Sequence, residues 1–179
     1  MLVLLKKILY LGVIIGMYEI AGLEDAILII VKGPATLNNS LYFQDFVVEM
    51  QNKGYKKFII DMAHCTMMDS TFMGMLTMLA SSPKEIVESL KLINLNEKHI
   101  TLLSNLGLVD ILPIVPGKIE VPTVETTQLN EYTYDQKRRL SLILEAHKKI
   151  VECSAKHNEN NEIFAEFIKE LTEELDQSK

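Results

Sequence analysis

The residues in this sequence with the clearest chemical potential are Asp69, Ser70 and Thr71. The apolar run at residues 57–62 is typical of a buried strand. The Asp-Ser-Thr triplet after it is typical of a helix start, because its side-chain oxygens can accept from free backbone N–H groups. We therefore expect the Ser70 hydroxyl at an exposed helix N-terminus, where these N–H groups and the helix dipole favour negative charge. A phosphate on Ser70 would be stabilised at this position. Because Asp69 beside it is also negative, phosphorylation would change the surface potential sharply.

A catalytic interpretation, with Asp61, His64 and Ser70 in one active site, has less support. The Gly-x-Ser-x-Gly motif of a nucleophilic serine is absent, because bulky residues occupy both glycine positions around Ser70. His64 and Cys65 are adjacent on a strand end and so point to opposite faces, and no second His or Cys lies at ligand spacing. The chain has no glycine-rich nucleotide motif. We expect no catalytic residue, no metal ion and no cofactor.

The composition indicates a globular protein without a nucleic-acid ligand. The chain has 179 residues, of which 48% are hydrophobic and 23% charged, enough for a buried core. Eighteen basic and 24 acidic residues give a net charge of −6, the opposite of the basic surface that nucleic-acid backbones require. The two isolated cysteines, Cys65 and Cys153, form no disulfide framework and fit a reducing, cytoplasmic compartment.

Strand-like and helix-like runs alternate between residues 18 and 124, which predicts an α/β fold: a small mixed sheet with helices packed on it. The expected strands cover residues 18–23, 26–31, 57–62, 90–95 and 119–124, with a breaker at 32–34. The expected helices begin at N-cap residues in 38–40, 69–71 and 96. Gly107 is expected to end the third helix in the left-handed conformation.

Beyond residue 128 the spacing of apolar residues predicts an α-helical hairpin. Each helix has one apolar stripe, which must be buried against the other helix, the sheet domain or a second chain. His147 lies in the first stripe, where we expect a satisfied core histidine. We divide the chain into a hydrophobic extension at 1–16, a sheet domain at 17–127 and a helical extension at 128–179.

Residues 1–16 allow several interpretations. Their apolar run is too short to span a membrane, and although it resembles a signal peptide, the candidate cleavage sites carry a charged or bulky residue where small ones are needed. We rank a start at Met17, or a loose hydrophobic extension, ahead of export.

The segment Met68-Asp69-Ser70-Thr71, with Gly74 four residues beyond the serine, resembles the STAS domain of bacterial anti-sigma-factor antagonists. In that family an Asp-Ser-Ser/Thr-Gly motif follows a buried strand and precedes the second helix. The resemblance covers roughly residues 18–124, including the turn at 33–36, the strand at 90–95 and the end of the third helix at 107–108. It does not cover the C-terminal hairpin.

The resemblance implies a non-enzymatic signalling role in transcription regulation. Ser70 would be the phosphoacceptor of a partner anti-sigma factor that is itself a serine kinase, and a serine phosphatase would reverse the reaction. The unphosphorylated form would bind the kinase and release the sigma factor. Phe72 departs from the family pattern, which usually has glycine there, and would narrow a kinase's approach. The implied partner-binding residues are Met67, Met68, Asp69, Thr71, Phe72 and Gly74, with both methionines on the surface around Ser70.

Two alternatives remain at this point. Asp69 and Ser70 can form an ordinary N-cap on a scaffold that has lost its switch. Alternatively, the protein is a constitutive scaffold that forms homo-oligomers through the C-terminal helices and docks a sensory or stress complex.

Overall fold

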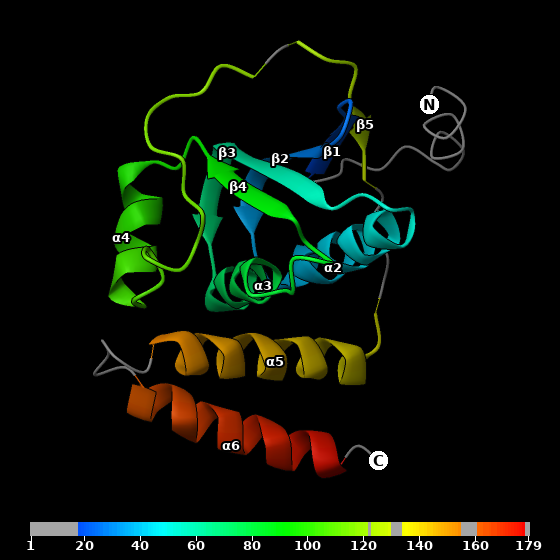
Figure 1. Ribbon diagram of the computed structural model, residues 1–179. Helices are drawn as coiled ribbons and strands as arrows, with labels where there is room; N and C mark the ends of the chain where they lie inside the picture. Colours follow the sequence, from blue (N-terminus) through cyan, green and yellow to red (C-terminus); the bar gives the residue numbers. More distant parts are fainter. Residues whose placement is uncertain (1–17, 122, 130–133, 155–160, 178–179) are drawn as a thin grey trace.

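The computed structural model describes residues 18–121, 123–129, 134–154 and 161–177, so the expectation for residues 1–16 lies outside the described part. At its centre is a mixed sheet of five strands in the order β4-β3-β2-β1-β5 (Figure 1). The strands are β1 (Tyr18–Gly22), β2 (Ile27–Ala35), β3 (Lys57–Met68), β4 (Ser89–Ile93) and β5 (Thr127–Gln128). The predicted small mixed sheet is confirmed.

Strand pairing follows the alternation in the sequence. β1 and β2 form the expected antiparallel hairpin, with Tyr18 opposite Val31, whereas β3 pairs in parallel with β2 and with β4. The predicted breaker at residues 32–34 does not end β2. Shifts of register on either side of Gly33, which has φ of 73°, let the strand continue through Pro34 to Ala35.

The predicted edge strand at residues 119–124 is wrong for its described residues, which form no strand. The backbone N–H of Ile119 donates to Oδ1 of Asn94 at 2.7 Å, so a side chain and not a neighbouring strand satisfies it. The short edge strand that does form is β5, on the opposite side of the sheet from β4, where it pairs with β1 over two residues.

The helices of the sheet domain are α2 (Leu37–Asn52), α3 (Ser70–Ala80) and α4 (Glu97–Asn105). Asn96 caps α4 as predicted, with Oδ1 accepting from the N–H of His99 at 2.9 Å, and Gly107 has the expected positive φ of 65°. The cap of α2 is Thr36, earlier than predicted. Asn39 assists from within the helix, where its Oδ1 accepts from the Thr36 N–H at 2.8 Å.

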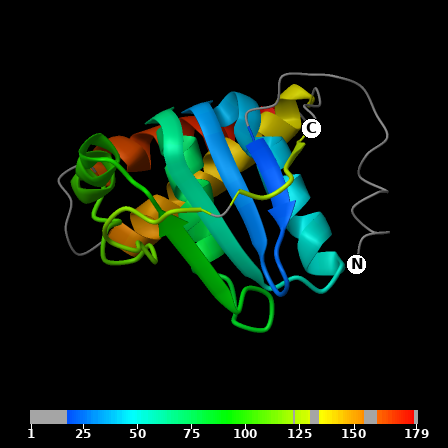
Figure 2. The ribbon, with the colours of Figure 1, turned by 90° about the horizontal axis from the view of Figure 1, so that it is seen from above.

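α2 and α3 cover one face of the sheet, and the segment around residues 115–126 crosses the other face (Figures 1 and 2). Between the sheet and the two helices, three aromatic rings contact one another in sequence in tilted and edge-to-face arrangements. The ring centroids of Tyr18 and Phe43 are 5.1 Å apart, and those of Phe43 and Phe72 are 5.7 Å apart. Phe72 is 0% exposed, so its ring belongs to the core and does not narrow the surface near Ser70 as the sequence suggested.

The predicted C-terminal hairpin consists of α5 (Gln136–Ser154) and α6 (Asn161–Gln177). α5 packs on α3, and α6 forms an outer layer on α5 (Figure 1). Ile150 is 0% exposed and joins the core of the sheet domain, whereas Leu140, Leu144 and Leu171 form a separate apolar cluster between the two helices. The stripe of α5 is therefore buried within the chain itself, against both the sheet domain and α6.

α3 and α5 approach each other closely at Gly74. A Cβ atom added there would lie 2.4 Å from the carbonyl oxygen of Ala146 and 2.7 Å from the Ala146 Cβ. Both obstacles belong to backbone or to a short side chain, so neither can rotate away. Glycine at this position allows α5 to pack directly on α3.

We expect Gly74→Ala to lower the free energy of unfolding by up to about 2 kcal/mol, because the added methyl group forces the two helices apart at a cost of about 1–3 kcal/mol, of which the helix propensity of alanine offsets about 1 kcal/mol. The direction of the change is diagnostic, because the helix propensity of alanine alone would raise the free energy of unfolding by about 1 kcal/mol. Urea unfolding of the full chain measures the change, with Lys148→Ala on the exposed face of α5 as control. A more stable Gly74→Ala variant would mean that α5 does not pack on α3 at this point.

Candidate functional site

Asp69 is the structural centre of the predicted site. Its Oδ1 accepts from the backbone N–H of Phe72 at 2.8 Å, which makes it the N-cap of α3. Its Oδ2 accepts from the backbone N–H of Leu37 at 2.8 Å, the first residue of α2. One carboxylate thus satisfies a free amide at the start of two helices, where the helix dipoles also favour its negative charge. The prediction that Asp69 shapes the helix start is confirmed.

Ser70, the first residue of α3, does not cap its own helix. Its Oγ lies 2.9 Å from Nε2 of His147, on α5. Nδ1 of the same imidazole lies 2.7 Å from the carbonyl oxygen of Ile143, which can only accept. Nδ1 therefore carries the proton of the neutral ring, Nε2 is the acceptor, and Ser70 donates its hydroxyl hydrogen to it.

His147 is enclosed from several sides. It is 3% exposed, and its ring centroid lies 5.3 Å from that of Phe164 and 4.9 Å from that of Phe167, both on α6. Burial lowers the pKa of His147 below its usual 6.5, against smaller opposing contributions from the Ile143 carbonyl and from Asp69, the N-cap of α3. Burial therefore favours the neutral imidazole, which can donate to Ile143 and accept from Ser70, and the satisfied core histidine predicted from the sequence is confirmed.

The predicted site residues differ in how far solvent reaches them. Met67 is 50% exposed, whereas Met68, expected on the surface with it, is 4% exposed because it ends β3 inside the core. Asp69 and Ser70 are partly buried, so the hydroxyl that we expected to be uncovered is partly covered, by α5. Thr71, Phe72 and Gly74 are buried.

Sequence reasoning did not find the partner of Ser70. His147 lies 77 residues further along the chain, and its only sequence signal is a histidine in an apolar helical stripe. That signal predicts burial but cannot say which group the imidazole meets, because the docking of α5 on α3 is a tertiary contact.

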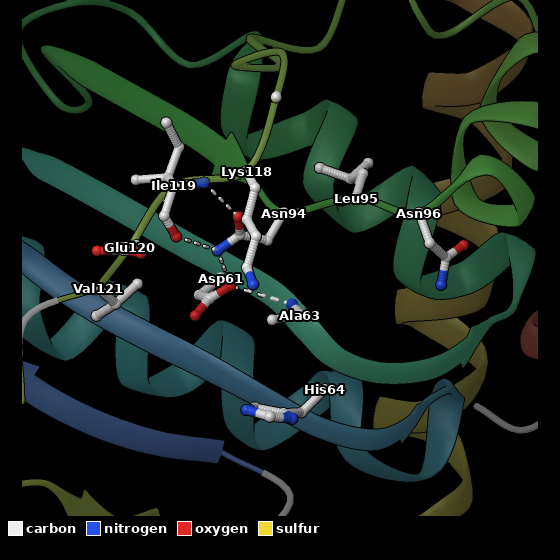
Figure 3. Close-up of a pocket in the computed structure, with 11 residues that line it drawn as sticks. Asp61, Ala63, His64, Asn94, Leu95, Asn96, Lys118, Ile119, Glu120 and Val121 are labelled. Atoms are coloured by element: carbon white, nitrogen blue, oxygen red, sulfur yellow. Dashed lines mark hydrogen bonds between the residues drawn. The ribbon is translucent and has the colours of Figure 1, made fainter.

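Asp61 and His64 line a different part of the molecule, a cavity of about 820 Å³ beside β3 and the end of β4 (Figure 3). Oδ1 of Asp61 accepts from the N–H of Ala63 at 3.0 Å and from Nδ2 of Asn94 at 2.8 Å. Nδ2 of Asn94 also donates to the carbonyl oxygen of Ile119 at 3.0 Å, so this network attaches the segment around Ile119 to the sheet. His64 takes no part in the hydrogen bonds drawn (Figure 3).

The structure gives no support to a combined site of Asp61, His64 and Ser70, because the imidazole bonded to Ser70 is that of His147. Cys65 is buried, and burial raises the pKa of its thiol. Within the described ranges, no group of three His, Cys, Asp or Glu side chains could hold a metal ion. None of the helices in that part of the chain is long and apolar enough to cross a membrane.

The family model described as "STAS domain" matches residues 17–120, more than half of the sequence. The chain therefore belongs to the STAS domain family. The comparison with curated proteins found no match.

Several solved structures are similar to part of this chain, and one of them has a TM-score above 0.5. The NMR structure of the protein TM1081 matches with a TM-score of 0.51 and 21% identity, over 59% of this chain and 84% of that one. A crystal structure of TM1081 from Thermotoga maritima, provisionally described as an anti-sigma factor antagonist, matches with a TM-score of 0.48 and 24% identity, over 55% and 85% of the two chains. The phosphorylated form of SpoIIAA, described as a Bacillus cell fate determinant, matches with a TM-score of 0.43 and 12% identity, over 55% of this chain and 91% of that one.

We expect Asp69→Ala to lower the free energy of unfolding by about 2 kcal/mol, because two helix caps worth about 1 kcal/mol each are lost together. Asp69→Asn should cost less, since the amide keeps one acceptor oxygen. Urea unfolding measures both. The matched control is Asp135→Ala, which removes the one bond from Oδ1 to the Arg138 N–H at 2.8 Å and should cost about half as much. Equal costs for Asp69→Ala and Asp135→Ala would contradict the double cap.

Stability should also fall on acidification, because the pKa of His147 is lower in the folded chain than in the unfolded chain. As the pH falls through about 6.5, the unfolded chain takes up the proton first, and stability present above that pH is lost. For His147 alone, the free energy of unfolding changes with pH by at most about 1.4 kcal/mol per pH unit.

Burial lowers the pKa of His99 as well, so the pH dependence of the parent chain contains a contribution from each histidine. The contribution of His147 is therefore measured by comparing variants. Unfolding is measured between pH 7.5 and 5. His147→Gln should show a shallower pH dependence than the parent chain, whereas Lys148→Ala should keep the parent's slope. Identical slopes for His147→Gln and the parent would contradict a buried, neutral imidazole.

Proposed function

We propose that this protein is a cytoplasmic, non-enzymatic regulatory binding protein of the anti-sigma-factor antagonist type, switched by phosphorylation of Ser70. Its partner is an anti-sigma factor that is also a serine kinase. The unphosphorylated chain binds this kinase, which then releases a sigma factor for transcription. Phosphorylation of Ser70 ends the binding, and a serine phosphatase restores it.

One observation carries this proposal: the helix cap belongs to Asp69, so the Ser70 hydroxyl is not needed to hold its own helix. Phe72 N–H donates to Asp69, whereas the hydroxyl of Ser70 bonds to His147. A phosphate on Ser70 would therefore leave the cap of α3 in place. The capping role proposed for the Asp69-Ser70 pair thus belongs to Asp69, and this supports a separate role for the Ser70 hydroxyl. Membership of the STAS family adds support.

The electrostatic consequence of phosphorylation fits a switch. A phosphoserine brings about −1.5 to −2 charges to a position one residue from the Asp69 carboxylate. In an interface with a kinase that holds a nucleotide, this charge would be buried opposite other negative groups. Such like-charge contacts cost several kcal/mol, enough to separate a complex of moderate affinity.

We expect Ser70→Ala to retain the partner kinase in the presence of ATP, because it cannot be phosphorylated, and Ser70→Glu to bind at least about tenfold more weakly, about 1.4 kcal/mol. The measurement is capture from the native cytosol on the immobilised full chain, with and without ATP, followed by mass spectrometry of the captured proteins and of Ser70. Ser82→Ala and Ser82→Glu, just beyond α3, are the matched controls.

Equal capture by the parent chain, Ser70→Ala and Ser70→Glu would contradict the switch. It would favour the alternative function, a non-switching STAS scaffold that docks a sensory or stress complex. Oligomerisation through the C-terminal helices remains a prediction of that alternative, tested by the mass of the protein in solution.

A further inference from the structure

The C-terminal hairpin, residues 136–154 and 161–177, lies over the helix that carries Ser70. The contacts extend from one end of α3 to the other. His147 meets Ser70 at the first residue of α3, Ala146 lies against Gly74, and Cys153 Sγ is 4.0 Å from Oγ of Ser81, just past the end of the helix. A second protein could not touch Gly74 while α5 occupies this position.

We propose that the C-terminal hairpin is an intramolecular competitor, which must move off α3 before a protein partner or a modifying enzyme can engage Ser70. This inference rests on the proposed function, because that function places the partner on the face around Ser70. Binding by the unphosphorylated chain then depends on the fraction of molecules in which the hairpin is displaced, and its apparent affinity is reduced by that fraction. A negative charge at position 70 weakens binding by its own repulsion even when the hairpin is displaced.

The two helices of the hairpin have an apolar cluster of their own and so can move together, although displacement must expose Ile150 of α5, which lies in the core of the sheet domain. The cluster of Leu140, Leu144 and Leu171 holds the two helices together independently of the main core. Several of the hairpin's links to the sheet domain are polar. Arg138 pairs with Asp45 at 2.7 Å, but their side chains are 49% and 45% exposed, and such exposed ion pairs contribute little.

The contact at Ser70 is the one that modification would change. Ser70 donates its hydroxyl hydrogen to Nε2 of His147, and a phosphate ester replaces that hydrogen. The ester oxygen and the neutral imidazole nitrogen would then both be acceptors. The buried nitrogen could regain a hydrogen bond to the phosphate only by taking up a proton, which its burial opposes. Phosphorylated Ser70 therefore opposes the return of the hairpin to its position on α3.

Hydrogen exchange of the full chain tests whether the hairpin separates from the rest. Backbone amides in residues 140–152 of α5 should exchange at least tenfold faster than those in residues 58–61 of β3, because they open without global unfolding. Ser70→Glu should increase the α5 rates at least tenfold further and leave the β3 rates unchanged, whereas Ser82→Glu should change neither. Equal rates for both segments, in the parent and in Ser70→Glu, would overturn the proposal.

A disulfide tests whether the closed arrangement excludes partners. Ser81→Cys would place a thiol beside that of Cys153, and the one other cysteine, Cys65, is buried. Oxidation should slow α5 exchange at least tenfold, and dithiothreitol should reverse this. Ser81→Cys combined with Cys153→Ser is the matched control, which cannot form the bond.

The oxidised Ser81→Cys chain should capture the kinase and become phosphorylated at Ser70 at least tenfold less than the same chain after reduction. Equal capture and phosphorylation in both forms would overturn the competitor proposal and leave the proposed function intact. If the parent chain neither captures a kinase nor becomes phosphorylated at Ser70, the proposed function fails. The exchange rates still decide whether the hairpin opens.

A second variant covers the case in which the disulfide does not form. Ala146→Leu would push α5 away from Gly74, because the larger side chain meets the helix backbone there. Exchange of α5 amides should rise at least tenfold with β3 unchanged, and Lys148→Leu on the exposed face is the control. If β3 accelerates together with α5, the hairpin is not a separate unit, and the proposal is wrong.

Discussion

Two helices of the sheet domain, α2 and α3, begin at the carboxylate of Asp69, which accepts from an amide of each. Asp69 directly follows β3, so this residue fixes the end of that strand and both helix starts relative to one another. Since the cap is complete without the next residue, the hydroxyl of Ser70 is left to bond outside its own helix. It meets His147, and this contact joins the STAS domain to the C-terminal hairpin.

The hairpin adds two helical layers to the matched family region, residues 17–120 (Figure 1). Its inner helix, α5, lies on the same helix that carries the proposed phosphoacceptor. Gly74 lets α5 come close enough for His147 to reach the hydroxyl of Ser70. The aromatic rings of α6 help to bury this histidine, and burial favours its neutral form. The chemistry available to Ser70 is therefore set by a part of the chain outside the family's domain.

Local signals predicted most of the fold. The antiparallel hairpin, the cap at Asn96 and the left-handed Gly107 follow from neighbouring residues, and the structure contains all three. The errors lie where a distant group satisfies the backbone. Ile119 bonds to the side chain of Asn94, so the segment after it forms no strand, and bulges against β3 carry β2 through Pro34.

The amino-acid sequence alone determined the α/β alternation, the helix that starts at the Asp69-Ser70 pair and the two amphipathic helices at the end, because periodicity and capping act over a few residues. Only the tertiary structure decided which surface receives the stripe of α5. That choice depends on the fit between Gly74 and Ala146 and on the meeting of Ser70 with His147. These are contacts between residues more than 70 positions apart, and no local pattern in a sequence records them.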